Sequence, residues 1–267
     1  MNKELSIVNY QLSFAKKSLG QHFLNDRGIA QKIVSSLRGD GICRVIEVGP
    51  GLGALSPFLL QDERFDVRFV EIDYEAAEYL KKKFPSINDK LIVADFLRYP
   101  FETYFGNEPL AIIGNFPYNI SSQIFFKILD HRSQVREVVG MLQKEVAERI
   151  AAPPGSKTYG ITSVLLQAFY DIEYLFTVHE HVFSPPPKVK SGVIRLTRNN
   201  VEALPCDEAL FFRTVKTAFN QRRKMLGNSL KTLLPADRSP HPIFSQRPEQ
   251  LGVHQFIELT KLIENAR

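Results

Sequence analysis

Glycines and acidic side chains follow three strand-like runs of this 267-residue chain. The first run, RVIEV (44–48), leads into glycines at Gly49 and Gly51, with a third at position 53. The second run ends at Glu71 and the third at Asp95. Glycines after a strand let the backbone approach a ligand closely, and an acid about 20 residues further on can accept hydrogen bonds from ribose hydroxyls. These residues together predict a nucleoside-binding site.

The spacing of the glycines indicates which class of nucleoside ligand the site would bind. The glycines read GxGxG, with Glu47 just before them, whereas a dinucleotide-binding enzyme needs GxGxxG. The spacing fits a ligand that carries an adenosine but no pyrophosphate, because a sulfonium cation needs no phosphate cradle at a helix N-terminus. We therefore predict S-adenosylmethionine as a methyl donor. A dinucleotide oxidoreductase is disfavoured, since no Tyr/Lys proton relay stands out either.

Asn115-Phe116-Pro117-Tyr118 follows the apolar run LAIIG (110–114) and predicts the methyl acceptor. An exocyclic amine of a base is a poor nucleophile, because its lone pair is delocalised into the ring. The amide oxygen of Asn115 and the carbonyl of Phe116 can accept hydrogen bonds from its N–H groups, and Pro117 fixes the turn. Tyr118 offers a flat face for the base, worth about 1–3 kcal/mol. Taken alone, these four residues are equally typical of a plain turn.

The elements that must position these residues alternate along the chain between strand-like and helical patterns. Strands are predicted at 44–48, 67–72, 90–94, 110–115, 136–143, 171–178 and 191–198, and helices at 29–37, 74–83, 121–130 and 144–150. Such alternation predicts an α/β fold with a mostly parallel sheet covered on both faces. Ligands of an open sheet bind outside the carboxyl ends of its strands, where the residues above lie.

The pattern changes after Arg198. A linker that contains Pro205 is followed by a helical region with further prolines. We therefore expect a first domain over residues 1–199 and a small helical domain over residues 200–267.

The motifs, taken in order, resemble those of the ribosomal RNA adenine dimethylases of the KsgA type. The matching segments are SLGQHFLND (18–26), EVGPGLGALS (47–56), EID (71–73), ADFL (94–97), NFPYNISS (115–122), VFSPPPKVKSGVIRL (182–196), AFNQRRKMLGNSL (218–230) and RPEQLGVHQFIEL (247–259). The resemblance implies a seven-stranded, Rossmann-like class I methyltransferase sheet with a small all-helical C-terminal domain. It implies dimethylation, from S-adenosylmethionine, of N6 of two adjacent adenosines in the 3′-terminal hairpin of 16S rRNA, which supports small-subunit assembly.

The resemblance also assigns roles residue by residue. It implies cofactor contacts from His22, Leu24, Gly49, Gly51, Glu71, Asp95 and Asn115, and catalytic contacts from Asn115, Phe116, Pro117, Tyr118 and Phe183. Phe183 would close on the far face of a flipped base, although a core position beside the prolines is the simpler interpretation of an aromatic residue there. Two positions depart from the family pattern: His22 stands where Asn is common, and Phe116 where Leu or Ile is commoner.

Basic residues cluster without counter-charges in the C-terminal region. Six of them and no acid lie between Arg213 and Lys231, against a net charge of +5 for the whole chain. Such a segment is either a phosphate-contacting surface or a solvated helix face. The residues expected to bind RNA are Lys188, Lys190, Arg222, Arg223 and Lys224.

Composition excludes several other classes of protein. Cys43 and Cys206 form no CxxC pair, so neither a disulfide-rich scaffold nor a cysteine zinc site is expected. HEH (179–181) lacks a third ligand, so no metal is predicted. No apolar run reaches the roughly 20 residues of a membrane span, and no signal peptide is evident. A cytoplasmic monomer that acts on the small ribosomal subunit, away from membranes, is the expectation.

Two alternatives remain open from the sequence. A large-subunit rRNA adenine methylase of the macrolide-resistance type shares NxPY, although AFNQRRKMLGNSL argues against it. A non-catalytic ribosome assembly factor is the other, and the intact Asn115, Glu71 and Asp95 argue against that.

Overall fold

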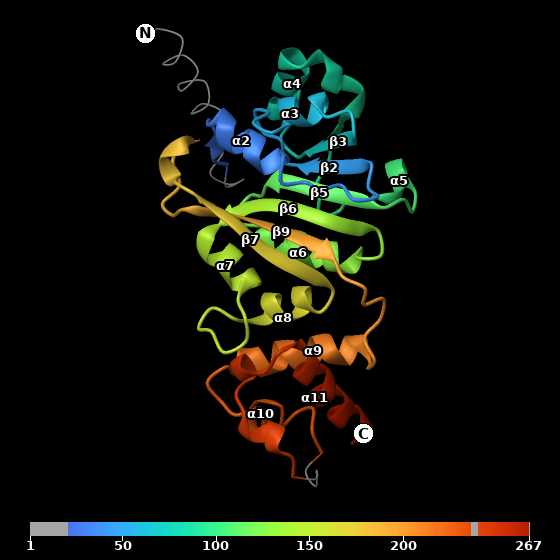
Figure 1. Ribbon diagram of the computed structural model, residues 1–267, viewed down its shortest axis with the longest axis vertical. Helices are drawn as coiled ribbons and strands as arrows, with labels where there is room; N and C mark the ends of the chain where they lie inside the picture. Colours follow the sequence, from blue (N-terminus) through green and yellow to red (C-terminus); the bar gives the residue numbers. More distant parts are fainter. Residues whose placement is uncertain (1–20, 236–239, 267) are drawn as a thin grey trace. The chain divides into compact units, whose positions relative to one another are not determined.

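The computed structural model describes residues 21–235 and 240–266, which divide into two compact units (Figure 1). The first unit is formed by Met1–Ala147 together with Glu173–Arg198, and the second by Glu148–Ile172 together with Asn199–Arg267. The segment 148–172, which we expected in the first domain, therefore belongs to the second unit. The reason is tertiary, because helix α8 (Ile161–Gln167) packs against the C-terminal helices.

A seven-stranded sheet is the centre of the first unit, as the resemblance implied. Its strand order is β4-β3-β2-β5-β6-β9-β7. The strands are β2 (Arg44–Val48), β3 (Asp66–Glu71), β4 (Leu91–Val93), β5 (Leu110–Asn115), β6 (Val135–Gln143), β7 (Tyr170–Val178) and β9 (Ser191–Arg198). Neighbours from β4 to β6 are parallel, and β9 runs antiparallel to β6. The predicted strands are confirmed, with β2, β5 and β9 at the predicted residues.

Continuous apolar runs form the central strands because both faces of the sheet are covered. Every residue from Leu110 to Gly114 in β5 is buried, and so are the last four residues of β2. In this sheet Val45 pairs with Val67 on one side and with Ala111 on the other, so the register aligns the ends of β2, β3 and β5. The strand ends therefore meet at one edge.

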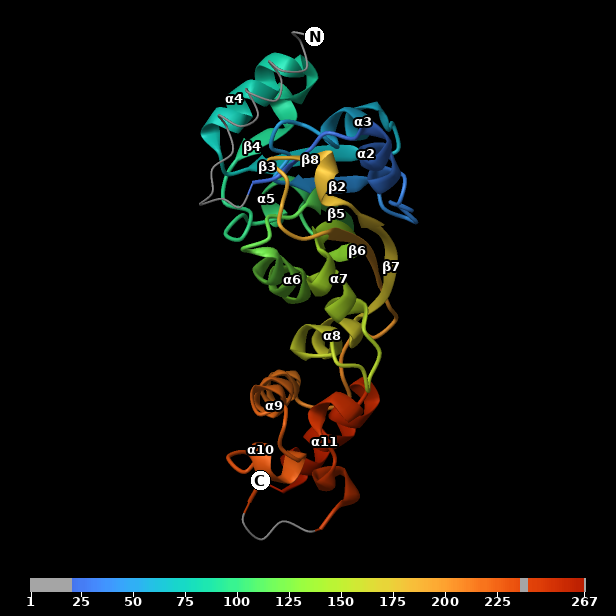
Figure 2. The ribbon, with the colours of Figure 1, turned by 90° about the vertical axis from the view of Figure 1, so that its left-hand side faces the viewer.

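The face of the sheet on which a helix lies depends on the direction in which the chain moves from one strand to the next. The chain moves outward from β2 to β3 to β4 through α3 (Ser56–Gln61) and α4 (Tyr74–Lys83), but in the other direction from β5 to β6 through α6 (Ser121–Asp130). Right-handed crossovers then place α6 on the opposite face from α3 and α4, which Figures 1 and 2 show. Helix α2 (Arg27–Val34) packs beside α3.

One hydrophobic core fills the space between the sheet and helices α2, α3 and α4. Ile33, Leu59 and Leu80 from the helices meet Phe69 and Ile113 from the strands, and all five side chains are buried. Burial of such side chains contributes about 1.5–3 kcal/mol each. This packing holds the strand ends in fixed positions.

A second sheet of two short strands was not predicted. Strand β1 (Phe23–Leu24) pairs antiparallel with β8 (Phe183–Ser184), with Phe23 opposite Ser184 and Leu24 opposite Phe183. Two residues are too few to show an alternating pattern in a sequence. The pairing brings the segment 21–24 beside the proline-rich segment that follows β8.

Helices dominate the second unit. Asp207 caps α9 (Glu208–Asn220), its side chain accepting a hydrogen bond from the backbone N–H of Leu210, and the rings of Phe219 and Phe256 stack between α9 and α11 (Val253–Asn265) at 5.8 Å. The remaining elements are α5 (Glu102–Phe105), α7 (Lys144–Ala151), α10 (Leu226–Ser229) and the short 3-10 helices Pro85–Lys90, Glu180–Val182, Pro242–Ser245 and Pro248–Gln250. Within the described residues, no helix has the length and apolar character needed to span a membrane.

Candidate active site at the strand ends

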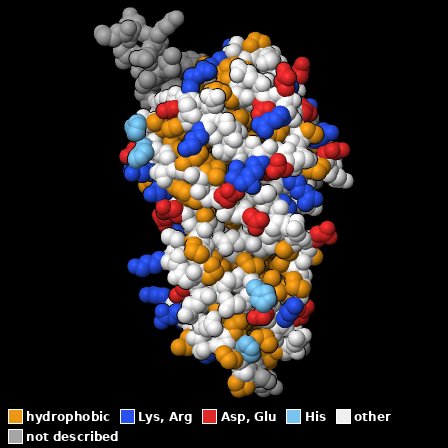
Figure 3. All heavy atoms as spheres, viewed as in Figure 1, with side chains coloured by type: hydrophobic (Ala, Val, Ile, Leu, Met, Phe, Trp, Pro, Cys, Tyr) orange, Lys and Arg blue, Asp and Glu red, His pale blue; other side chains and the backbone are white. Residues whose placement is uncertain are grey.

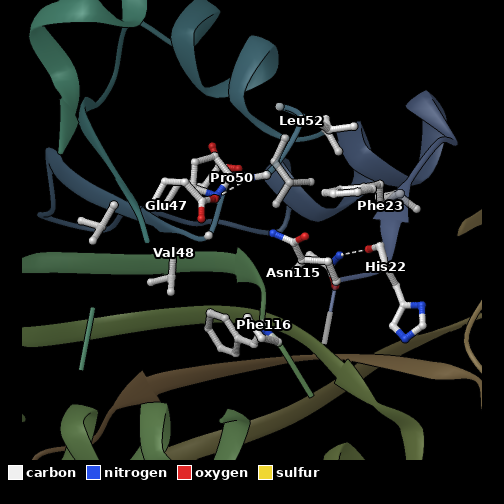
Figure 4. Close-up of a pocket in the computed structure, with 18 of the residues that line it drawn as sticks. His22, Phe23, Glu47, Val48, Pro50, Leu52, Asn115 and Phe116 are labelled. Atoms are coloured by element: carbon white, nitrogen blue, oxygen red, sulfur yellow. Dashed lines mark hydrogen bonds between the residues drawn. The ribbon is translucent and has the colours of Figure 1, made fainter. Parts of the chain in front are cut away.

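A cavity of about 1020 Å³ opens at the carboxyl ends of β2 to β5 (Figure 4). Its walls come from the glycine loop (residues 49–53), the end of β3, residues 94–97 after β4, residues 115–120 after β5, and residues 21–27. Almost every residue predicted for the site lines this one cavity. The cavity therefore lies at the sheet edge where the strand pattern predicted a ligand site.

The three glycines of the loop adopt positive φ angles for different local reasons. Gly49 has a φ of +63°, and a Cβ added there would meet nothing within 4 Å, so this position faces open space. At Gly51, with a φ of +57°, an added Cβ would come within 3.1 Å of the Phe23 ring. At Gly53 it would come within 2.6 Å of Phe84. Gly49 thus leaves room in the cavity, whereas Gly51 and Gly53 allow close packing.

Glu71 holds the glycine loop in place. The side chain is buried, and its two oxygens accept backbone N–H groups from Gly51 and Asp73, each at 2.9 Å. Burial raises the pKa of Glu71, and these two hydrogen bonds oppose the rise. Each carboxylate oxygen keeps a further lone pair. The predicted role as a ribose ligand is compatible with this structural one.

Asp95 lies on the next wall of the cavity. One of its oxygens accepts the backbone N–H of Leu97 at 2.9 Å, and the other is 3.6 Å from the guanidinium of Arg98. These contacts turn the chain after β4, so that Asp95 and Leu97 both line the cavity.

Glu47 is a cavity residue whose burial was not predicted from the sequence. It is only 2% exposed, accepts a hydrogen bond from the Ser56 hydroxyl at 2.8 Å, and lines the cavity. Burial, with a contribution from the charge of Glu71, raises the pKa of Glu47 from 4.5 to about 8 against the effect of the Ser56 bond. Its burial could have been predicted, because Glu47 is an acidic residue within a strand that is covered on both faces.

Asn115 ends β5 and is tied to the segment 21–24. Its side-chain nitrogen donates to the backbone carbonyl of His22 at 2.9 Å (Figure 4). The bond fixes the orientation of the amide, so its oxygen is the group that remains available as an acceptor. Because Asn115 lines the cavity, that acceptor belongs to the site.

Phe116 contributes its backbone, and its ring belongs to the core. The side chain is 1% exposed and packs edge-on against Phe125 with ring centroids 5.8 Å apart. It also fills the space beside Gly140, where an added Cβ would collide with it, and an added Cβ at Gly114 would come within 3.1 Å of it. The backbone N–H of Phe116 donates to the carbonyl of Met141, which orders the turn into Pro117.

Tyr118 forms a half-buried wall of the same cavity. Its hydroxyl hydrogen-bonds the Ser191 hydroxyl at 2.7 Å, and its ring centroid lies 5.5 Å from that of His22. Burial raises the pKa of Tyr118, and the bond to Ser191 opposes the rise. The ring is thus held at both ends and is neutral at physiological pH.

Residues 21–24 line the cavity and contact residues from several distant segments. Gln21 donates to a carboxylate oxygen of Asp73 at 3.3 Å, and Nδ1 of His22 lies 2.8 Å from the carbonyl of Pro185. Phe23 packs on Gly51, as described above, and Leu24 is buried but lines the cavity. Gln21 and Phe23 were missed because their roles depend on contacts with residues far along the chain.

Phe183 does not line the cavity in this structure, so its predicted contact with a flipped base stays a prediction. The side chain is 3% exposed, belongs to the core with Leu24 and Val178, and does not line the cavity. The β1–β8 pairing places it opposite Leu24. Stacking on a base would require Phe183 to leave this core.

The residues predicted to bind RNA differ in whether their side chains are exposed to a ligand. Lys188 and Lys190 in the first unit are exposed, as are Arg223 and Lys224 in the second. Arg222, however, donates to the carbonyl of Ser156 at 3.1 Å and lies 3.9 Å from Glu249, so it orders its own neighbourhood. Figure 3 shows Lys and Arg side chains projecting from the lower half of its view, where the second unit is drawn.

The histidines of HEH (179–181) lie close together in the structure. The rings of His179 and His181 lie 5.8 Å apart. Among the residues that the structure describes, no group of three or more His, Cys, Asp and Glu is arranged to hold a metal ion.

A sheet of this strand order, with a glycine loop after the first long strand and acids after the next two, defines a class I methyltransferase. The family profile described as "Ribosomal RNA adenine dimethylase" matches residues 13–262. The chain therefore belongs to the ribosomal RNA adenine dimethylase family.

Curated relatives and solved structures agree with this assignment. "Ribosomal RNA small subunit methyltransferase A" of Cytophaga hutchinsonii is 59% identical over 93% of this chain and 97% of its own, and that of Flavobacterium johnsoniae is 57% identical over 94% and 96%. The 23S rRNA methyltransferase ErmE has a TM-score of 0.65 at 27% identity, covering 91% of this chain and 99% of its own. A dimethyladenosine transferase from Plasmodium falciparum has a TM-score of 0.75 at 23% identity, covering 92% and 98%, which shows the shared fold.

Proposed function

We propose that this protein transfers methyl groups from S-adenosylmethionine to N6 of two adjacent adenosines in the 3′-terminal hairpin of 16S rRNA. The product is N6,N6-dimethyladenosine in the small ribosomal subunit, whose assembly the reaction supports in the cytoplasm. One observation carries the chemistry: the Asn115 amide is fixed by the His22 carbonyl so that its oxygen remains an acceptor in the cavity. The names of the relatives support the choice of the small subunit.

The cavity fits the proposed donor in size and in chemistry. A volume of about 1020 Å³ is at the upper end of the range for small-molecule sites. The position of Gly49 leaves open space where any other residue would place a Cβ. Glu71 and Asp95 offer carboxylate oxygens to hydroxyl and amine donors. S-adenosylmethionine, when bound, would supply an electrophilic methyl group: its S–CH3 bond would break as the N–CH3 bond forms, and S-adenosylhomocysteine would leave as a neutral thioether.

Asn115 and the turn after it activate the acceptor amine. The amide oxygen of Asn115 and the backbone carbonyl of Phe116 accept hydrogen bonds from the two N–H groups of an adenine amine. These bonds draw the nitrogen towards tetrahedral geometry and free its lone pair for attack. No strong base is needed, because the methylated amine is acidic enough to lose its proton to water. Positioning and electrostatics then supply most of the rate enhancement.

Tyr118 holds the base. Its ring is fixed by the bond between its hydroxyl and Ser191 and by contact with His22. A base that enters the cavity has left its helix, at a cost of a few kcal/mol. Stacking on an aromatic ring recovers about 1–3 kcal/mol of that cost.

Exposed cations supply the contacts to the RNA backbone. Lys188 and Lys190 follow the prolines of the first unit, and Arg223 and Lys224 follow α9 in the second. Lysine and arginine contacts of this kind bind phosphates without reading sequence, and they weaken as salt rises.

Labelled-methyl transfer tests the proposal. Small subunits from cells that lack the modification are incubated with the protein and labelled donor, and the rRNA is digested to nucleosides for mass spectrometry. Label in N6,N6-dimethyladenosine from the 3′-terminal fragment is the expected result. Naked 23S rRNA serves as the competing substrate, because label found there alone would assign the chain to the large-subunit methylases. Donor binding without transfer to any rRNA would leave only a role in assembly.

A further inference from the structure

Lys127, on α6, is buried although it carries a charge. The residue is only 9% exposed, and its ammonium group donates to two backbone carbonyls, that of Tyr99 at 2.7 Å and that of Leu97 at 3.2 Å. Lysine is almost never buried to this degree unless its charge is compensated. A compensated and buried ammonium indicates a specific structural task.

Aromatic rings complete the surroundings of this ammonium. Its nitrogen lies 4.7 Å from the ring centroid of Phe101 and 5.7 Å from that of Phe96, distances at which a cation is attracted to a ring face. The rings of Phe96 and Phe101 contact each other at 5.6 Å, and Phe101 contacts His131 at 4.7 Å. His131 in turn bonds the Lys127 carbonyl through Nδ1. The side chain of Lys127 is therefore enclosed by residues 96–101 and the end of its own helix.

The two segments that Lys127 joins form different walls of the active site. Residues 95–97 line the cavity after β4, and their chain direction depends on the carbonyls that Lys127 binds. Helix α6 begins at Ser121, directly after the wall formed by residues 115–120. Lys127 thus connects the wall that contains Asp95 with the wall that contains Asn115.

From this geometry we propose that Lys127 is a positioning residue for the donor-binding wall. It fixes residues 95–97 relative to α6, so that the site is already formed when S-adenosylmethionine arrives. This inference rests on the proposed function, because it assumes that the wall at Asp95 contacts the donor. A neutral side chain of similar length would fill the space but remove the two hydrogen bonds that Lys127 donates to the carbonyls of Leu97 and Tyr99. The loop would then relax, and donor affinity would fall.

Calorimetry with S-adenosylhomocysteine tests the proposal. Lys127→Met is expected to weaken binding about tenfold, with kcat at saturating donor reduced less than about threefold, since a displaced wall costs affinity first. Lys127→Arg keeps a cation with several donors and is expected to restore most of the affinity. Val67→Ala is the control for lost stability, because Val67 is a core residue at the opposite end of β3 from Glu71. It should lower Tm and leave the affinity unchanged.

The outcomes separate this inference from the proposed function. Unchanged affinity in folded Lys127→Met, or an equal loss in Val67→Ala, would overturn the positioning role. Failure of the wild-type protein to bind S-adenosylhomocysteine would instead overturn the proposed function. If Lys127→Met does not fold, hydrogen exchange of the wild-type protein tests the positioning role instead. The amides of residues 97–101 and 127–131 should gain protection together when S-adenosylhomocysteine binds, and no gain in either segment would contradict the proposal.

Discussion

The side-chain nitrogen of Asn115 donates to the backbone carbonyl of His22 at 2.9 Å, across 93 residues of sequence. This bond joins the end of β5 to the segment 21–24 of the cavity wall, and it fixes which end of the amide accepts. The position of the Asn115 amide oxygen therefore depends on that segment. Replacement of Asn115 should affect both the activation of the acceptor amine and the position of the segment 21–24. Two variants can separate these effects.

Asn115→Ala removes both the acceptor and the bond to His22. We expect kcat for methyl transfer to fall by about 10²–10³, as when one such polar group is removed from other active sites. Asn115→Asp keeps an acceptor but places a carboxylate oxygen against the His22 carbonyl, so its main effect should be weaker donor binding. Steady-state kinetics with calorimetry distinguishes the two. Equal loss of kcat in both variants, with donor affinity intact, would contradict a role for the His22 bond.

Two variants of Tyr118 distinguish the contribution of its ring from that of its hydroxyl. Tyr118→Phe loses the hydrogen bond to Ser191, worth about 1 kcal/mol, and keeps the flat face. Tyr118→Ala loses the face, so kcat/KM for the RNA should fall by about 5–150-fold, equivalent to about 1–3 kcal/mol of stacking. Transfer assays on both variants check this order. An equal loss in the two would show that the hydroxyl, not the ring, is what matters.

Gly49 and Gly51 form a matched pair of positions. Alanine at either has a positive φ, which costs about 1–2 kcal/mol of stability. At Gly51 the new Cβ also meets Phe23, whereas at Gly49 it enters open space in the cavity. We expect Gly51→Ala to lower Tm more and Gly49→Ala to weaken donor binding more. Thermal unfolding and calorimetry of both variants test this, and the reverse ranking would be inconsistent with Gly49 facing the donor.

Glu47 gives the protein a pH-dependent stability with a defined sign. Its pKa is raised from 4.5 to about 8 in the folded protein, mainly by burial. The stability it contributes is therefore complete below about pH 4.5 and is lost as pH rises through about 8. Glu47→Gln stays neutral and keeps an acceptor for Ser56, so its unfolding free energy should decline less over that range, by up to a few kcal/mol. Parallel pH profiles of the two proteins would show that Glu47 is ionised normally.

Phe183 can be tested as a core residue. Phe183→Ala should cost about 3–5 kcal/mol of stability, because it leaves a cavity among Leu24 and its neighbours. Phe183→Leu keeps most of the apolar volume and should cost less than about 1.5 kcal/mol while methyl transfer persists. Thermal unfolding alongside transfer assays measures both. A stable Phe183→Leu protein without activity would restore the stacking role expected from the sequence.

The parts of the fold that could be predicted are those with a local signal. Strand β5 is apolar from Leu110 to Gly114 because helices cover both faces of a parallel sheet, and this pattern is visible without a structure. The residues after them, including Gly49, Asp95 and Asn115, fall at one edge for a topological reason that sequence order reveals. These strand-end residues of the cavity lining therefore followed from the sequence.

The missed parts depend on distant contacts. The β1–β8 pairing joins residues about 160 positions apart through only two residues in each strand. Glu47 and Lys127 are polar residues whose burial is determined by neighbours from other elements. The segment 148–172 packs with α9 and α11, and no local feature near residue 148 marks the change of unit.

In the proposed reaction Asn115 presents its amide oxygen to the amine of an adenine brought to the methyl donor. The most direct test is a crystal structure of the protein with S-adenosylhomocysteine and an RNA fragment that contains the target adenosines. We expect the donor sulfur beside the wall of Gly49 and Asp95, with the adenine amine within hydrogen-bond distance of the Asn115 oxygen and its ring on Tyr118. A donor bound elsewhere, or an adenine whose amine points away from Asn115, would contradict it.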